Sequence, residues 1–254
     1  MRDEYVDTLL GEFLQNQLKS AGSYGAVLGL SGGLDSTVVA FLATRSLGAD
    51  NVLALLLPEG SVTPEEDLED ARIVAHQLKI EHKEIDISNI LEGYYQALPL
   101  KEAPRVVNGN LKARIRMTII YWHANLLNRL VLGTGNKTEI MLGYCTKHGD
   151  AAADILPLAG LYKDQVRQLG EKLGVPQRIL DKAPTAGLWL GQTDEDELGI
   201  TYREANEILR DIERGLDEVN LKDKYDEIQV ELVLNRVKKS KHKRELPPMP
   251  TMWL

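Results

Sequence analysis

Apolar residues follow two different spacings along the first half of the chain. Short unbroken apolar runs, such as residues 51–57 (NVLALLL), are typical of strands buried on both faces of a parallel sheet. Between these runs, apolar residues recur every three or four positions, which is typical of amphipathic helices. The two spacings predict strands at 26–30, 51–57, 84–87 and 130–133, and helices at 5–18, 37–47, 64–78, 90–98 and 111–128. Because strands and helices alternate, we expect an α/β fold with a doubly wound parallel sheet flanked by helices.

Two short patterns mark expected helix starts. In Thr63-Pro-Glu-Glu66, a threonine precedes a glutamate by three residues, which is a capping-box pattern with proline at the first helical position. Thr201-Tyr-Arg-Glu204 repeats the pattern and predicts a helix to about residue 214, before another over 221–240. The C-terminal part is therefore expected to be helical. A chain of this length can bury one large α/β core, so we treat residues 1–254 as a single catalytic domain.

The expected sheet also predicts where a ligand binds. In doubly wound sheets, ligands lie outside the carboxyl ends of the strands, so the turns after residues 29 and 132 are expected to face one site. Residues 144–160 and 183–199 are rich in Gly, Asp and Thr and show weak periodicity. Irregular segments of that length in a compact domain are usually binding loops or lids.

Composition narrows the class of protein. The formal net charge is -8 with a pI near 5.3, which disfavours extensive nucleic-acid binding and confines any basic site to a local cluster. The single cysteine, Cys145, excludes an intrachain disulfide and a multi-cysteine metal site, as expected in a reducing cytoplasm. No 18-residue apolar run and no signal-peptide pattern occur, so we expect a cytoplasmic protein that does not enter a membrane.

The junction between the first strand and the next helix carries the clearest chemistry. Residues 29–36 read Gly-Leu-Ser-Gly-Gly-Leu-Asp-Ser, where Gly32 and Gly33 allow the backbone to wrap an anion beside a helix N-terminus. Ser31 and Ser36 add hydroxyl donors. Because a carboxylate beside a polyphosphate is repulsive without a divalent cation between them, Asp35 implies Mg²⁺ as well as a nucleotide. The alternative interpretation is an ordinary Gly-Ser turn.

Glu139 is the natural partner of Asp35. It ends the run Gly133-Thr-Gly-Asn-Lys-Thr-Glu139, in the second turn expected at this edge of the sheet. Mg²⁺ typically takes one or two carboxylates together with phosphate oxygens and water. A solvated helix residue is the alternative for Glu139, and spacing alone does not decide between the two.

These motifs resemble those of a known family. The loop at 31–36 differs from the Walker and dinucleotide-binding patterns and resembles the SGGxDS loop of the N-type ATP pyrophosphatases. The resemblance to ammonia-dependent NAD⁺ synthetases covers nearly the whole chain. It is carried by the segments NLKARIRMT (110–118), GTGNKTE (133–139), KHGDAAAD (147–154), LPLAGLYK (156–163), APTA (183–186) and HKR (242–244).

That resemblance implies an adenine nucleotide alpha hydrolase-like fold, a homodimer, and ATP-dependent amidation of deamido-NAD⁺ by ammonia, the last step of NAD⁺ biosynthesis. The reaction would pass through an NAD-adenylate and release AMP and pyrophosphate. The implied site residues follow by substrate. Those for ATP are Gly29, Leu30, Ser31, Gly32, Gly33, Leu34, Asp35, Ser36, Thr134, Lys163 and Thr185; those for deamido-NAD⁺ are Arg114, Lys147, Asp154, His242 and Lys243; those for Mg²⁺ are Asp35 and Glu139.

Several of these residues also have a physical interpretation. Lys163 could neutralise the charge that develops on a pyrophosphate leaving group, and its alternative is a solvated lysine at a helix start. Arg114 and Arg116 point in different directions on a helix, so one is expected to bind substrate and the other to pair with an acidic neighbour. We expect Arg114 to be the substrate ligand.

Other features remain open from the sequence alone. The basic tail at 237–245 is either a solvated helix end or a clasp for a dinucleotide diphosphate, and the resemblance favours the clasp. Tyr121 and Trp122 are expected to pack in a core or a subunit interface, and Cys145 is expected to be a thiol without a catalytic role.

Two kinds of rival function remain open from the sequence. One is another ATP pyrophosphatase, such as the amination domain of GMP synthetase or a tRNA-modifying enzyme. The other is a nucleotide-binding sensor without chemistry.

Overall fold

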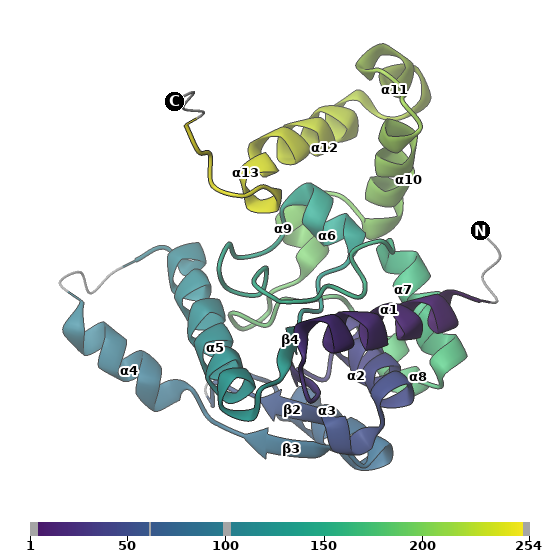
Figure 1. The fold of residues 1–254 in the computed structure, drawn as a ribbon. Coiled ribbons are helices and arrows are strands. Elements are labelled where there is room, and N and C mark those ends of the chain that lie inside the picture. Colours follow the sequence, from purple (N-terminus) through teal and green to yellow (C-terminus); the bar gives the residue numbers. More distant parts are fainter. Residues whose placement is uncertain (1–4, 61, 99–102, 251–254) are drawn as a thin grey trace.

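A small parallel sheet forms the centre of the molecule. The computed structural model describes residues 5–60, 62–98 and 103–250. Within them, four strands run in the order β3-β2-β1-β4, formed by Glu81–Glu84, Val52–Leu56, Ala26–Gly29 and Leu130–Leu132 (Figure 1). The chain moves outward from β1 to β3 and then crosses back to β4. The predicted doubly wound parallel sheet is therefore confirmed, and its switch point lies between β1 and β4.

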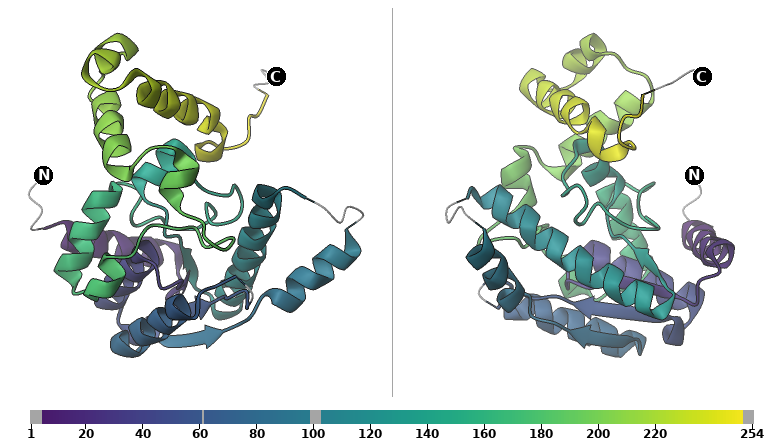
Figure 2. Two further views of the ribbon diagram at one scale, coloured as in Figure 1. Left: turned by 180° about the vertical axis from the view of Figure 1, so that it is seen from behind. Right: turned by 60° about the vertical axis from the view of Figure 1, so that its left-hand side comes forward.

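Helices cover both faces of this sheet (Figures 1 and 2). Side chains of β1 alternate between the faces: Leu28 joins a core with α1, α2, α3 and α7, whereas Val27 joins a core with α4 and α5. A third core holds α6 against α10, α11 and α12. The helices are α1 (Val6–Ala21), α2 (Leu34–Leu47), η2 (Ala49–Asn51), α3 (Glu65–Leu78), α4 (Ser88–Ala97), α5 (Arg105–Leu127), α6 (Lys137–Leu142), α7 (Lys163–Leu173), α8 (Gln177–Leu180), α9 (Asp194–Leu198), α10 (Tyr202–Glu213), α11 (Glu218–Lys224), α12 (Glu227–Lys239) and α13 (Lys241–Arg244).

The prediction for the third strand was wrong. β3 is formed by Glu81–Glu84, whereas the sequence pattern placed it at 84–87. β3 is an edge strand with largely exposed charged side chains, so no apolar run marks it. Ile85 and Ile87, which gave the misleading pattern, follow the strand, and their N–H groups continue the hydrogen bonding to β2 and the turn beyond it.

One of the two predicted capping boxes was also wrong. Pro64 is itself the N-cap of α3, without a side-chain hydrogen bond to the helix. The Thr63 hydroxyl instead accepts a hydrogen bond from the N–H of Glu59 at 3.0 Å and so closes the turn after β2. The second capping box, between Thr201 and Glu204, is confirmed at the start of α10.

Several helices differ in extent from the predictions. α2 begins at Leu34 rather than at 37, which brings Asp35 into its first turn, and α5 begins at Arg105 rather than at 111. The single helix predicted over 221–240 is two helices. Tyr225 is extended between them, and the Asp226 side chain caps α12 by accepting a hydrogen bond from a backbone N–H of its first turn.

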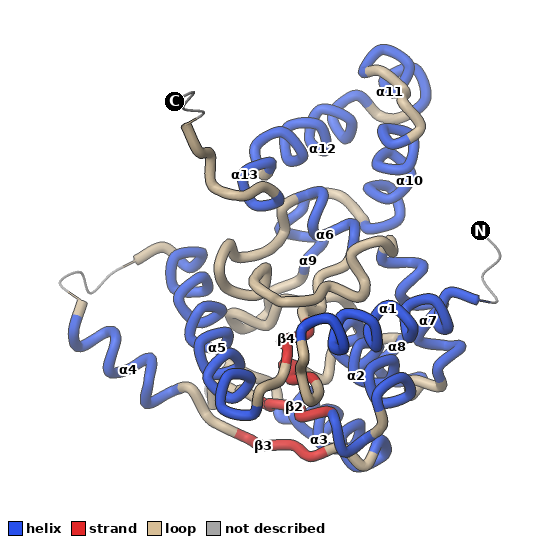
Figure 3. Tube along the Cα trace, in the orientation of Figure 1, coloured by secondary structure: helices blue, strands red, loops and turns tan. Residues whose placement is uncertain are grey.

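Two irregular segments lie where the sequence predicted them. Residues 144–160 and most of 183–199 are loops between the sheet and the C-terminal helices, and the short helix α9 ends the second (Figure 3). As for membranes, no helix in the described ranges is both long enough and apolar enough to cross one.

Candidate active site

The loop between β1 and α2 is held by hydrogen bonds around its two serines. The Oγ atoms of Ser31 and Ser36 lie 2.9 Å apart, and Ser31 Oγ accepts a hydrogen bond from the N–H of Gly33 at 3.2 Å. Ser36 Oγ accepts from the N–H of Ser31 at 3.2 Å and donates to the carbonyl of Gly33 at 3.1 Å. Because α2 starts directly after Gly33, the free N–H groups of its first turn lie beside these hydroxyls. The arrangement suits the phosphate-binding role predicted for residues 29–36.

Gly32 is required at its position by geometry. Its φ angle is +78°, and a Cβ atom there would lie 2.0 Å from the backbone carbonyl oxygen of Asp67 on α3. Any other residue would clash with the helix backbone, which cannot move aside cheaply. The loop is therefore pressed against α3.

Asp35, Glu139 and Lys163 come together at the switch point of the sheet. They lie on α2, α6 and α7, which start close to the carboxyl ends of β1 and β4. Lys163 Nζ forms a short ion pair with Asp35 Oδ2 and lies 3.4 Å from Glu139 Oε1. Each of the three side chains is at most 17% exposed. Neither Lys163 nor Glu139 is the solvated helix residue that was the alternative interpretation.

Burial shapes the electrostatics of this cluster. Burial together with the nearby charge of Asp35 raises the pKa of Glu139 to about 8. Burial alone would lower the pKa of Lys163, but the charges of Asp35 and Glu139 outweigh it, and that pKa is raised. Two buried carboxyl groups therefore share one ammonium, and a bound cation would favour the ionised form of Glu139.

The residues present fit Mg²⁺. Asp35 and Glu139 offer hard oxygen donors in a buried setting, which is the ligand chemistry that this ion prefers. Among the described residues, no group of three or more His, Cys, Asp or Glu side chains forms a metal site by itself. Phosphate oxygens and water would have to complete the coordination, as is usual for Mg²⁺ at nucleotide sites.

Sequence reasoning missed Asn136, which joins the two carboxylates. Asn136 is fully buried; its side-chain N–H donates to Asp35 Oδ1 at 3.0 Å, and its Oδ1 accepts from the N–H of Glu139 at 3.1 Å. The Glu139 carboxylate accepts from the N–H of Asn136 in return, which completes a capping box at the start of α6. The pattern Asn-x-x-Glu within GTGNKTE could have indicated this cap.

Tyr202 and Asp194 were also missed. The Tyr202 hydroxyl lies 2.8 Å from Asp194 Oδ2 and 3.4 Å from Glu139 Oε1, and the Tyr202 ring lies 5.1 Å from Lys163 Nζ. The sequence predicted only a helix start around Tyr202 and an irregular loop around Asp194. No local pattern predicts that they meet Lys163.

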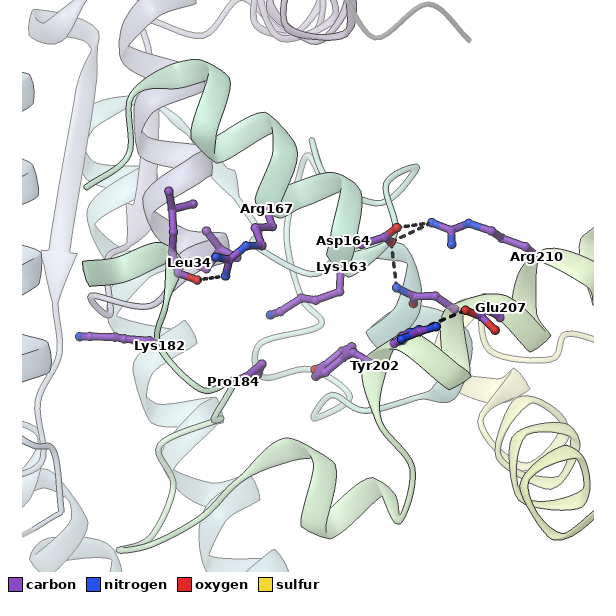
Figure 4. A pocket seen from close by; sticks show the side chains of 12 residues that line it. Leu34, Lys163, Asp164, Arg167, Lys182, Pro184, Tyr202, Glu207 and Arg210 are labelled. Carbon is purple, nitrogen blue, oxygen red and sulfur yellow. Dashed lines mark hydrogen bonds and ion pairs between the residues drawn. The ribbon is translucent and has the colours of Figure 1, made fainter. Parts of the chain in front are cut away.

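A cavity of about 410 Å³ opens beside Lys163 (Figure 4). Its walls include Leu34 from the phosphate loop (residues 29–36), Pro184 from the segment 183–199, and Tyr202. Thr185 follows Pro184, is exposed, and accepts a hydrogen bond from the N–H of Gly187 at 3.1 Å. Thr134 is half-buried in the turn between β4 and α6. The two segments predicted to bind ATP thus border one space.

A second cluster unites four of the five residues predicted for deamido-NAD⁺. The guanidinium of Arg114 donates to the carbonyl of Lys147, and Lys147 Nζ donates to the carbonyl of His242 at 2.7 Å. Lys243 Nζ donates to the carbonyls of Gly143 and Cys145 at 2.7 and 2.6 Å. The basic tail therefore folds back onto the loop after α6.

Asp154 lies at the edge of this region rather than within it. Its carboxylate accepts hydrogen bonds from the N–H of Val131 at 2.8 Å and from the Tyr121 hydroxyl at 3.2 Å. Tyr121 is seven residues, or two helical turns, beyond Arg114 on α5, so the two lie on the same side of that helix. Trp122, next in sequence, is 60% exposed and is not part of a core within the chain.

Arg116 and Cys145 have environments that fit the roles expected of them. Arg116 points inward and donates to the carbonyl of Leu57 at 2.9 Å, with Glu59 as its acidic neighbour. The Cys145 thiol is half-buried, and burial together with Asp150 raises its pKa to about 11. A thiol that stays protonated at neutral pH is a poor nucleophile.

The fold and the site identify a broad structural class, and the comparisons with known proteins then identify a family. A parallel sheet flanked by helices, with a glycine-serine loop and a buried carboxylate pair at its switch point, is an adenine nucleotide alpha hydrolase-like arrangement. Residues 7–247 match the family model described as NAD synthase. The chain belongs to the NAD synthase family.

Its relatives are similar over nearly their whole length. An NH₃-dependent NAD⁺ synthetase of Methanosarcina acetivorans is 48% identical over 245 residues, covering 95% of this chain and 96% of that protein. One of Archaeoglobus fulgidus is 48% identical over 249 residues, covering 98% and 97%. Among solved structures, an NMN synthetase from Francisella tularensis matches with a TM-score of 0.89 at 39% identity, and an NH₃-dependent NAD synthetase from Campylobacter jejuni with 0.83 at 31%. Both structural matches cover 99% of this chain and all of the other.

Proposed function

We propose that this chain is an ammonia-dependent NAD⁺ synthetase, which uses ATP to amidate deamido-NAD⁺. The observation that carries the proposal is the meeting of the phosphate loop with Asp35, Glu139 and Lys163 at the switch point of a NAD synthase-family fold. The nicotinate carboxylate attacks the α-phosphate of ATP and expels pyrophosphate, which leaves an NAD-adenylate. Ammonia then adds to the activated acyl carbon, and collapse of the tetrahedral intermediate expels AMP.

The ATP-binding residues have distinct tasks in this proposal. Residues 29–36 bind the phosphates through backbone N–H groups and the Ser31 and Ser36 hydroxyls, with Thr134 and Thr185 as further contacts. Lys163 places an ammonium where charge develops on the departing pyrophosphate. Asp35 and Glu139 would hold Mg²⁺, which when bound neutralises phosphate charge and polarises the phosphoryl oxygens. Catalysis then depends mainly on positioning and electrostatics.

The second substrate lies at the other end of α6. α6 begins beside Asp35 and Lys163, and its C-cap is Gly143, whose carbonyl accepts a hydrogen bond from Lys243 Nζ. Six helical residues span about 9 Å, so the two clusters are separated by roughly the reach of a nucleotide. Arg114, Lys147, Asp154, His242 and Lys243 are the proposed contacts of deamido-NAD⁺. Arg114, Lys147 and Lys243 are held by backbone carbonyls that a dinucleotide diphosphate can replace as acceptors.

We also propose that the chain acts as one domain and as a homodimer. In support of a single domain, α6 packs in the C-terminal core through Leu142 while Asn136, its N-cap, binds Asp35 beside the sheet. In support of a dimer, Trp122 and Leu126 on α5 are 60% and 66% exposed and lie one turn apart. A cytoplasmic location remains a prediction from the sequence.

Purified protein with ATP, Mg²⁺, ammonium and deamido-NAD⁺ should form NAD⁺, AMP and pyrophosphate in equal amounts. Exchange of labelled pyrophosphate into ATP, dependent on the nicotinate substrate, would report the adenylation step and separate the enzyme from a nucleotide sensor. ADP as the nucleotide product would contradict the proposal. The similarity to an NMN synthetase makes nicotinate mononucleotide the necessary comparison substrate. A higher kcat/KM for nicotinate mononucleotide than for deamido-NAD⁺ would show that the chain is an NMN synthetase instead.

A further inference from the structure

Lys182 binds the phosphate loop, residues 29–36, at Gly32 and not at the cluster of Asp35, Glu139 and Lys163. Its Nζ atom lies 3.3 Å from the carbonyl oxygen of Gly32, 2.5 Å from Asp67 Oδ1 and 2.5 Å from Asp70 Oδ2. In Figure 4 its ammonium points away from Lys163. The Lys182 side chain is 19% exposed and that of Asp70 only 1%, so these contacts are shielded from solvent. None of the roles proposed above uses this residue.

The contact with Gly32 fixes one peptide group. The Gly32 carbonyl and the Gly33 N–H belong to the same trans peptide and therefore point in opposite directions. Lys182 binds the carbonyl, and Ser31 Oγ accepts the hydrogen bond from the N–H at 3.2 Å. Both ends of the peptide are thus held, and the Ser31 hydroxyl, which lies 2.9 Å from that of Ser36, is oriented through it.

This peptide is the one most able to rotate out of place. Glycine lies on both sides of it, so no Cβ atom restricts its rotation. A rotated peptide would turn a carbonyl oxygen toward a bound phosphate, which is repulsive, and would break the hydrogen bond from the Gly33 N–H that orients the Ser31 hydroxyl. Asp67 limits such movement twice, by its backbone carbonyl against Gly32 and by its carboxylate on Lys182.

We propose that Lys182 is a positioning residue that keeps the Gly32 carbonyl turned away from the phosphates of ATP. The inference rests on the proposed function, because it takes the loop to bind ATP. Lys182 also immediately precedes the segment 183–199, which carries Thr185, so one ammonium couples the two segments that border the cavity beside Lys163. Lys182 itself lines that cavity, and its ammonium is held by Gly32, Asp67 and Asp70, so its effect is expected on ATP alone.

Arg178 provides a matched control. It pairs with the other oxygen of the same buried carboxylate, Asp70, but has no contact with the loop in the structure. Lys182→Met should raise the KM for ATP about tenfold and lower kcat, since it removes a charge-assisted hydrogen bond from the loop, and leave the KM for deamido-NAD⁺ unchanged. Arg178→Met should change the KM for ATP less than about twofold, even if it lowers the melting temperature as much.

Two further variants guard against simple unfolding. Lys182→Met leaves Asp70 with one partner fewer, so the double variant Asp70→Asn/Lys182→Met removes the excess buried charge and should restore stability without restoring the KM for ATP. Lys182→Arg, which keeps a cation near Gly32, should recover much of the ATP affinity.

Calorimetric binding of Mg²⁺ with α,β-methylene-ATP completes the test. Weaker binding in the folded Lys182 variants and not in Arg178→Met supports the inference. Equal affinity in wild type and the double variant, or equal losses in Lys182→Met and Arg178→Met, would overturn it. A wild-type protein that binds the analogue but forms no NAD⁺ contradicts the proposed function and leaves the Lys182 comparison valid. A wild-type protein that does not bind the analogue overturns both.

Discussion

The side-chain amide of Asn136 donates a hydrogen bond to Asp35 Oδ1 at 3.0 Å, which joins the turn after β4 to the first turn of the helix after β1. Through its Oδ1, the same side chain caps the helix that carries Glu139. The spacing of the two carboxylates is therefore set by one buried amide. Lys163 is the first residue of α7, so the position of that helix start then determines how far its ammonium lies from the two carboxyl groups.

Replacing Asn136 should separate helix capping from carboxylate positioning. Asn136→Ala loses the cap, at about 1 kcal/mol of stability, together with the donor to Asp35. Asn136→Asp keeps the capping oxygen but puts a third buried carboxyl group beside Asp35 and Glu139, so the melting temperature should fall through repulsion rather than through loss of the cap, and kcat should fall by at least about tenfold. Thermal unfolding and steady-state kinetics of the two variants check this. Wild-type kcat in Asn136→Asp would show that the amide does not position the site.

Removing either carboxylate should abolish adenylation without unfolding the protein. In Asp35→Ala and Glu139→Ala, exchange of pyrophosphate into ATP should fall by more than about a hundredfold, while ATP binding weakens less, because the metal acts chiefly on charge that develops in the transition state. Glu218→Ala is the control, since the Glu218 side chain is 58% exposed and pairs with Lys222 of its own helix, α11. Wild-type turnover by either site variant at saturating Mg²⁺ would mean that the shared metal site is wrong.

The sequence predicts the parts of the site that are local. Residues 29–36 are recognisable because the glycines, the serines and the adjacent apolar strand are contiguous, and the fold follows from alternating spacings. Glu139 could be predicted because it lies in the second turn at the same edge of the sheet. Edge strand β3 was misplaced because its position is determined by pairing with β2 and not by an apolar run of its own.

Contacts between distant segments were beyond local reasoning. Tyr202 and Asp194 reach Lys163 only because α10 and the end of the segment 183–199 fold back toward α7. The contact between Lys182 and Gly32 joins residues 150 positions apart. In each case the functional property is proximity, which depends on tertiary packing rather than on the spacing of residue types.

The basic tail should affect one substrate only. His242→Ala combined with Lys243→Ala should raise the KM for deamido-NAD⁺ by about tenfold or more, through loss of charge-assisted contacts to the diphosphate, and leave the KM for ATP nearly unchanged. Lys241→Ala is the control, because Lys241 is exposed and lies 3.5 Å from Glu245 on the outer surface. Equal changes in both KM values would mean that the tail only supports the structure, for example through the contacts of Lys243 with Gly143 and Cys145.

Stability of the C-terminal helices should decline in acid through Asp211. Hydrogen bonds from Lys224 and Tyr225 lower the pKa of Asp211 from 3.8 to about 2 in the folded protein. A lowered folded-state pKa stabilises the protein above the unfolded value, so this contribution is present above about pH 4 and is lost as pH falls toward 2. Asp211→Asn should be less stable than wild type at pH 7, and the difference should shrink as pH falls through this range. Melting curves between pH 7 and pH 2, with Asp223→Asn as an exposed control, measure the effect; a pH-independent difference would contradict it.

Free ammonia should be the nitrogen donor, and glutamine alone should not support NAD⁺ formation. Hydrolysing glutamine needs an activated nucleophile such as a cysteine with a supporting base. The chain has one cysteine, and burial with Asp150 raises the pKa of the Cys145 thiol to about 11, so the thiolate is scarce at neutral pH. Activity with ammonium salts should rise with pH while the protein stays folded, because neutral ammonia becomes a larger share of the total. Cys145→Ser should keep most of this activity at every pH. NAD⁺ formation from glutamine without added ammonium, lost selectively in Cys145→Ser, would show that both the thiol and the nitrogen source had been misassigned.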